Sequence, residues 1–166
     1  MNFVTGGSGL VGSHILLELA KKSEPIVALK RITTDLSVVK ELFSTYSLSS
    51  EFDKINWVDG DLSDINVLLE HLEGCENIYH AAALVSFDSS DRLELIETNI
   101  EGTSNLVDAA LIIKPTKLIY LSSTSAIGKQ PKTKVINETN EWDPDHKNGY
   151  YSFSKQYHKF YLIIHF

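Results

Sequence analysis

Cysteine is nearly absent from the chain, and several other features that define large classes of protein are missing as well. Cys75 is the one cysteine among 166 residues, which excludes a disulfide framework and a thiolate metal site, so we expect no bound metal. No apolar run approaches the roughly 18 residues that a membrane-spanning helix needs, and no signal-type leader precedes the first apolar segment. We therefore expect a cytoplasmic protein with no membrane partner.

Positive charge is also scarce. The chain has 15 Lys and Arg residues against 22 Asp and Glu residues, for a net charge of −7, and no run of basic residues. Nucleic acids and anionic membranes attract clustered positive charge, so the sequence predicts neither partner. Its hydrophobic content of 43% and its length suit one globular domain with its own core.

Two patterns of apolar residues alternate along the chain. Short apolar runs at 2–5, 25–29, 54–58, 77–82 and 117–122 predict strands, and helical spacing of apolar residues predicts helices at 10–19, 36–43, 65–72 and 90–113. Residues 44–52 are interpreted as a surface connection. Such alternation is typical of a parallel sheet covered on both faces, and we predict one Rossmann-type, doubly wound α/β domain over residues 1–166 with strand order 3-2-1-4-5.

Glycine is concentrated where the first strand meets the first helix. Residues 5–12 read TGGSGLVG, with Gly6, Gly9 and Gly12 spaced by three. Glycines at this spacing permit a tight turn, let backbone approach a pyrophosphate and let the helix pack on the strand; a purely structural turn is the alternative. The helix that follows offers free N–H groups to phosphate. We predict a dinucleotide site that includes Gly6, Gly9, Leu10, Val11 and Gly12.

The end of the second strand bears on the choice of dinucleotide. Lys30 and Arg31 stand where NAD-binding versions of this motif carry an acidic residue for the ribose hydroxyl. A guanidinium matches a 2′-phosphate instead, so we predict NADP, with Arg31 as its contact and NAD still possible. Two alternatives stay open: the basic pair is a solvated strand end, or Asp35 folds back onto the ribose.

Three further features stand in order behind the glycines. Tyr151 and Lys155 are four residues apart, which places both side chains on one helix face, where the ammonium favours the tyrosinate. Ser122 and Ser123 follow the fifth strand, and Asn99 lies inside the long predicted helix although asparagine is a poor helix former. Each feature alone also has an ordinary structural explanation.

Together these motifs resemble the extended short-chain dehydrogenase/reductase family. Within it the chain is similar to the NAD-dependent epimerase/dehydratase group, with likeness to the dihydroflavonol reductase and 3β-hydroxysteroid dehydrogenase branches. The resemblance covers essentially all of the chain: TGGSGLVG is similar to the family's glycine motif, GDLSD (60–64) to its adenine-side motif and HAAA (80–83) to its cofactor-lining fourth strand.

The resemblance implies an activity and a set of roles. It implies an oxidoreductase that transfers hydride between a nicotinamide and an alcohol or ketone carbon of a small molecule, with a homodimer built on the helices that contain Asn99 and Tyr151. Counting back from Gly128 makes Ser123 the catalytic serine, with Tyr151 and Lys155 as the catalytic pair and Asn99 on a proton relay. The implied cofactor contacts, besides the glycine loop and Arg31, are Asp61, Leu62, Ala81, Ala82, Ala83, Tyr151 and Lys155.

The sequence also departs from the family pattern. The acidic residue after the second strand is missing, and Ile127 stands where nucleotide-sugar members often carry tyrosine. The family usually needs roughly twice this length, so we expect an amino-terminal fragment, truncated before the carboxyl-terminal strands and substrate domain, that is itself inactive. A dinucleotide-binding module without catalysis, or an inactive truncated product, is therefore the alternative function.

Overall fold

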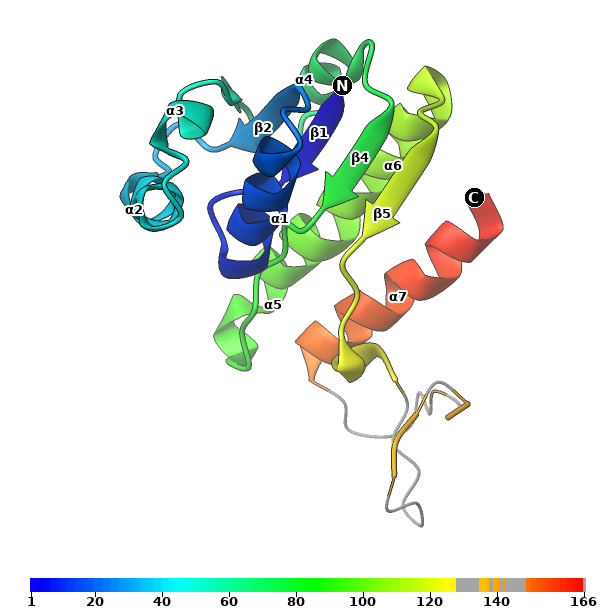
Figure 1. Ribbon diagram of the computed structural model, residues 1–166. Helices are drawn as coiled ribbons and strands as arrows, with labels where there is room; N and C mark the ends of the chain where they lie inside the picture. The colour runs from blue at the N-terminus through cyan, green and yellow to red at the C-terminus, as the bar shows by residue number, and fades with distance from the viewer. Residues whose placement is uncertain (128–134, 138, 141, 143–148, 166) are drawn as a thin grey trace.

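The computed structural model describes residues 1–127, 135–137, 139–140, 142 and 149–165, with side chains described as far as residue 157. Gly128, from which the position of the catalytic serine was counted, lies outside the described residues. The strands and the helices between them alternate along the chain (Figure 1). The strands are β1 (Asn2–Thr5), β2 (Ile26–Lys30), β3 (Asn56–Asp59), β4 (Asn77–His80) and β5 (Lys117–Tyr120). The helical elements are α1 (Leu10–Lys21), α2 (Ser37–Thr45), α3 (Ser49–Phe52), α4 (Ile65–Leu72), η1 (Ser89–Asp91), α5 (Arg92–Leu95), η2 (Ile96–Glu101), α6 (Gly102–Ile113), η3 (Thr124–Ala126) and α7 (Tyr150–His165).

The five strands form one parallel sheet. Their order is β3-β2-β1-β4-β5, which confirms the predicted topology. Because all strands run in the same direction, their carboxyl ends meet at one edge (Figure 1). The register places Thr5 beside His80 and His80 beside Tyr120 at that edge. The loops that leave these strand ends are the ones that build the site.

Apolar side chains on both faces of the sheet hold the helices in place. One core cluster joins the sheet to α4 and α6 around Phe3, Leu68, Ile78 and Leu106, all fully buried. The other joins it to α1 and α2 around Val4, Leu16 and Phe43. A sheet covered on both faces buries enough apolar surface to fix its strand ends rigidly, which a preformed site requires.

Three local predictions are wrong in detail. Residues 44–52 are not a plain connection, since they include the end of α2 and all of α3, which places Phe52 against the second core cluster. The long helix predicted at 90–113 is instead α5, a π-helical turn η2 and α6. The apolar spacing that predicts helices at 10–19 and 90–113 includes Leu10 and Leu93, yet these side chains are 79% and 72% exposed, because each lies in the first turn of its helix, ahead of the residues that pack on the sheet.

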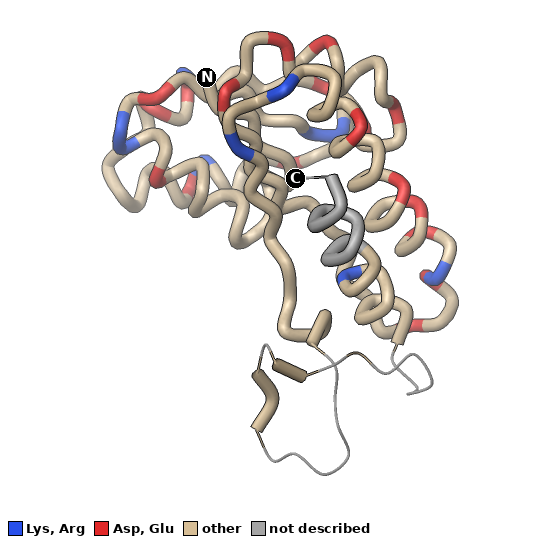
Figure 2. The backbone as a smooth tube through the Cα atoms, turned by 90° about the vertical axis from the view of Figure 1, so that its right-hand side faces the viewer, with Lys and Arg blue, Asp and Glu red and all other residues tan. Residues whose placement is uncertain are grey.

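Acidic residues are spread along the chain, with basic residues interspersed between them (Figure 2). Within the described part of the chain, no helix has the length and apolarity that crossing a bilayer would demand.

Candidate functional site

The glycine loop after β1 closes tightly on the rest of the site. Gly6 has a φ of +70°, and a Cβ there would lie 2.5 Å from the backbone nitrogen of Ala82 in the loop after β4. A Cβ on Gly12 would overlap the carbonyl oxygen of Gly6, which also accepts a hydrogen bond from the Gly9 backbone N–H at 3.0 Å. Only glycine fits at Gly6 and Gly12, so the loop geometry follows directly from the sequence.

The amino terminus of α1 is open toward this loop. Gly9 is its N-cap, no side chain caps the helix, and its first turn contains no acidic residue. The first backbone N–H groups of a helix have no intrahelical acceptor, and the positive end of the helix dipole lies beside them. Leu10 and Val11, at this end, are 79% and 45% exposed. A glycine-rich loop before an uncapped helix fits the phosphates of a dinucleotide.

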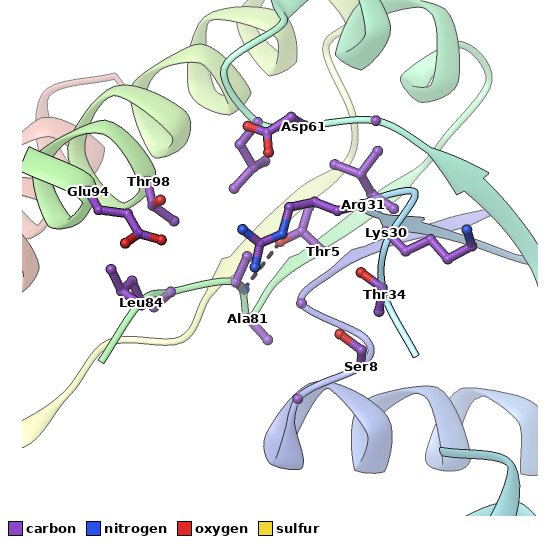
Figure 3. Close-up of a pocket in the computed structure, with 17 residues that line it drawn as sticks. Thr5, Ser8, Lys30, Arg31, Thr34, Asp61, Ala81, Leu84, Glu94 and Thr98 are labelled. Atoms are coloured by element: carbon purple, nitrogen blue, oxygen red, sulfur yellow. Dashed lines mark hydrogen bonds between the residues drawn. The ribbon is translucent and has the colours of Figure 1, made fainter. Parts of the chain in front are cut away.

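A cavity of about 230 Å³ lies at the carboxyl edge of β1, β2 and β4. Figure 3 shows side chains from several strand ends and from the α5–η2 segment gathered around it. It brings together most of the predicted cofactor contacts. Its lining consists of Thr5, Gly6, Ser8, Gly9, Leu29, Lys30, Arg31, Thr34, Gly60, Asp61, Leu62, Ala81, Ala82, Ala83, Leu84, Glu94 and Thr98.

The two basic residues at the end of β2 have different environments. Lys30 lines the cavity, but its ammonium forms an ion pair with Asp59 at the end of β3 and lies away from the Arg31 guanidinium (Figure 3). Arg31 extends into the cavity, and no described carboxylate forms an ion pair with it. The carboxylate of Asp35 accepts hydrogen bonds from the backbone and the hydroxyl of Ser37, both at 2.8 Å. Arg31 is therefore the cation that a ligand meets, and Asp35 is engaged elsewhere.

A buried hydrogen-bond chain fixes the strand ends below the cavity. The Thr5 hydroxyl lies 2.6 Å from Nδ1 of His80 and accepts from the Ala82 backbone N–H at 3.3 Å. On the other side of the ring, Nε2 lies 2.9 Å from the Thr103 hydroxyl on α6. His80 is 1% exposed, so it is a packing residue at the end of β4.

Tyr151 and Lys155 lie beside the end of β5, outside the cavity lining. Both are buried on α7, at 9% and 3% exposure. The Lys155 ammonium donates to the Leu121 carbonyl at 3.2 Å and lies 4.8 Å from the centre of the Tyr120 ring. Burial lowers the pKa of Lys155 to about 8. Burial, and secondarily the neighbouring Tyr151, raises the pKa of Tyr120.

Ser123 follows β5 and precedes η3, which contacts α7. Its hydroxyl accepts a hydrogen bond from the Ser125 backbone N–H at 3.1 Å, so it caps the short helix and keeps its proton free to donate. The described hydrogen bonds do not join Ser123, Tyr151 and Lys155 directly.

Asn99 is buried inside the π-helical turn and connects two parts of the site. Its side-chain oxygen accepts from the Leu84 backbone N–H at 2.7 Å, while its amide donates to the Leu84 carbonyl at 2.9 Å and to the Ser154 hydroxyl at 3.1 Å. Ser154 in turn donates to the Tyr151 carbonyl at 2.8 Å. Asn99 therefore joins the loop after β4 to the helix of Tyr151 and Lys155.

Sequence reasoning missed several residues of the site. Ser8, Thr34 and Leu84 lie near predicted contacts in the sequence, so their place in the cavity lining could have been predicted from the loops that follow the strands. Glu94 and Thr98 come from a separate helical segment, and no sequence signal marks them. Tyr120 was assigned only to a strand, and its contact with Lys155 emerges only from the fold.

Comparisons with known proteins agree with this geometry. The family model for the NAD-dependent epimerase/dehydratase family matches residues 2–163. A sterol-4-alpha-carboxylate 3-dehydrogenase of Dictyostelium discoideum is 27% identical over 164 residues, covering 97% of this chain and 47% of that protein. A dihydroflavonol 4-reductase of Gerbera hybrida is 27% identical over 141 residues, covering 84% of this chain and 38% of that protein.

A solved structure is similar over the same region. The UDP-glucose 4-epimerase of Thermus thermophilus, in complex with NAD, superposes with a TM-score of 0.78 at 25% identity, covering 98% of this chain and 50% of that one. The chain spans about two fifths of the length of the curated relatives it matches. With its glycine loop, strand order and matched family model, the chain belongs to the NAD-dependent epimerase/dehydratase family of extended short-chain dehydrogenases/reductases.

Proposed function

We propose that these residues form the cofactor-binding half of an NAD(P)-dependent oxidoreductase that acts on an alcohol or ketone carbon. The observation that carries the proposal is the shared sheet edge: an uncapped helix and glycine loop open onto a cavity, and the strand ends β4 and β5 connect that cavity to Tyr151 and Lys155. The names of two relatives, a dehydrogenase and a reductase, support hydride transfer as the reaction class.

We propose NADP as the preferred cofactor. Gly6, Gly9, Leu10, Val11 and Gly12 would hold the pyrophosphate at the start of α1. Arg31, with its guanidinium in the cavity and no described carboxylate paired with it, would bind the 2′-phosphate. Asp61 and Leu62 would lie on the adenine side, and Ala81, Ala82 and Ala83, which line the cavity after β4, would form a wall of the cofactor site.

The side chains at the end of β5 would supply the acid–base chemistry. The bound nicotinamide supplies the hydride acceptor or donor. Tyr151 exchanges a proton with the substrate oxygen, and Ser123 donates a hydrogen bond to that same oxygen. Lys155 would bind the nicotinamide ribose. Asn99 would support the proton path by holding the Leu84 backbone and the Ser154 hydroxyl in place through its hydrogen bonds.

The direct test of this chemistry is Tyr151→Phe in the enzyme that contains these residues. We expect turnover to fall by about 10²–10⁴, the usual contribution of a positioned general acid or base, while NADPH affinity changes little because the phenol is not a main binding group. Tyr157→Phe, an exposed tyrosine on the same helix, is the matched control and should retain full turnover. Near-parental turnover in Tyr151→Phe would contradict the assignment. Dinucleotide binding without turnover in the unmodified enzyme would favour the alternative of a non-catalytic binding module.

We also propose a homodimer through the α5–α6 segment and α7. Leu93, Phe153 and Tyr157 are exposed apolar or aromatic side chains on these helices, at 72%, 48% and 43%. Light scattering at micromolar concentration should report twice the chain mass, and a monomer would refute the proposal.

A further inference from the structure

Lys155 holds its charge in an unusual environment. Its side chain is 3% exposed, and among the described residues no carboxylate forms an ion pair with it. Its ammonium donates a hydrogen bond to a neutral acceptor, the Leu121 carbonyl, at 3.2 Å. A buried ammonium with so little compensation is costly, and its position is poorly determined unless another group attracts it.

The face of the Tyr120 ring is that other group. The ammonium lies 4.8 Å from the ring centre, within the range of a cation–π contact. Tyr120 in turn lies beside His80, with ring centres 5.5 Å apart. The His80 ring is held on both nitrogens by Thr5 and Thr103. The ring under Lys155 is therefore fixed to the same strand ends that carry the glycine loop.

We propose that Tyr120 is a positioning residue. The face of its ring stabilises the Lys155 ammonium and fixes its position, since no carboxylate among the described residues pairs with it. The role rests on the proposed function, in which Lys155 contacts the nicotinamide ribose. Through Tyr120, one continuous path of contacts runs from Thr5 and His80, at the strand ends below the cavity, to Lys155 on α7.

The experiment measures the protonation of Lys155 directly, in the ligand-free chain. The Lys155 side-chain signals are followed by NMR from pH 6 to 11 after selective labelling and assignment with Lys155→Arg. Tyr120 is the titratable group in contact with Lys155, with Tyr151 and His80 next to Tyr120 in turn. All variants are therefore compared at the same pH values, so that differences in the titration of these neighbours can be recognised.

The attraction of the ring face for the ammonium is weakened in graded steps. Tyr120→Phe keeps the face and removes the hydroxyl, and phenylalanines with one, three and five ring fluorines at position 120 then reduce the attraction for a cation with almost no change of shape. We expect the proton affinity of Lys155 to be unchanged in Tyr120→Phe and to fall stepwise by about 3- to 30-fold across the fluorinated series. Ile119→Ala, on the same strand, should leave it unchanged.

A flat response across the fluorinated series, or a rising proton affinity, would overturn the proposal and leave Tyr120 as a packing residue. The same variants are then titrated with NADPH, and affinity should fall in parallel with the proton affinity. Failure of the unmodified chain to bind NADPH would instead refute the proposed function, since the Lys155 titration needs no ligand.

Discussion

The two halves of the site are built by different means. The cofactor half, from β1 to the loop after β4, is shaped by backbone: Gly6 and Gly12 admit no Cβ, and the first turn of α1 has no side-chain cap. The proposed catalytic half, between β5 and α7, is shaped by buried side chains, with Lys155 held against a ring and a carbonyl. The backbone-built half has no room for a side chain at Gly6 or Gly12, whereas a half built from side chains can be tuned residue by residue.

The largest effect should come from adding one carbon to the backbone-built half. In Gly12→Ala the new Cβ overlaps the Gly6 carbonyl, so the loop must move away from α1. We expect NADPH binding to weaken by about 100-fold or more and the free energy of unfolding to fall by about 2 kcal/mol.

Gly149→Ala is the matched control, because a Cβ there meets nothing within 4 Å. Calorimetric titration and urea unfolding of both variants make the comparison. Parental NADPH affinity in Gly12→Ala would show that the close loop–helix contact is unnecessary for binding.

In the side-chain-built half, Lys155→Met should raise stability in a pH-dependent way. The pKa of Lys155 falls from its ordinary 10.5 to about 8 through burial. Below pH 8 Lys155 is protonated in both the folded and the unfolded state, and burial of the ammonium lowers the free energy of unfolding by roughly 3 kcal/mol at most. Between pH 8 and 10.5 the unfolded state binds more protons than the folded state, so wild-type stability rises.

The gain in the free energy of unfolding from Lys155→Met should therefore be largest below pH 8 and shrink as the pH approaches 10.5. Urea unfolding of the two proteins at pH 7 and pH 9.5 measures this. A gain equal at both pH values would mean that the Lys155 ammonium is not destabilised in the fold.

The smallest effect should come from the cavity rim. Arg31→Asp removes the guanidinium that faces the ligand and should erase or reverse a preference for NADPH over NADH of roughly 1–3 kcal/mol. Lys30→Ala is the comparison, and because Lys30 is already paired with Asp59 it should change the preference much less. Equal affinities of the unmodified chain for NADPH and NADH would remove the basis for the NADP proposal.

The same contrast explains how far the sequence could predict the molecule. The alternating strands and helices and the glycine loop were predictable, because periodicity and a local turn each depend on neighbouring residues. The strand order followed from the Rossmann-type topology that this alternation and the glycine loop indicate. The contact of Tyr120 with Lys155, and the Asn99 link to Leu84 and Ser154, join residues distant in the sequence and required the packed fold. The different roles of Lys30 and Arg31 likewise depended on the register of β2 against β3, which places Lys30 beside Asp59.

The claim that a dinucleotide lies along both halves of this edge is tested most directly by amide NMR during an NADPH titration. We predict saturable shifts, with one common affinity, at Gly9, Leu10 and Val11 in the backbone-built half and at Leu121 in the side-chain-built half. Shifts that are absent at the glycine loop, or that saturate at different affinities in the two halves, would contradict it.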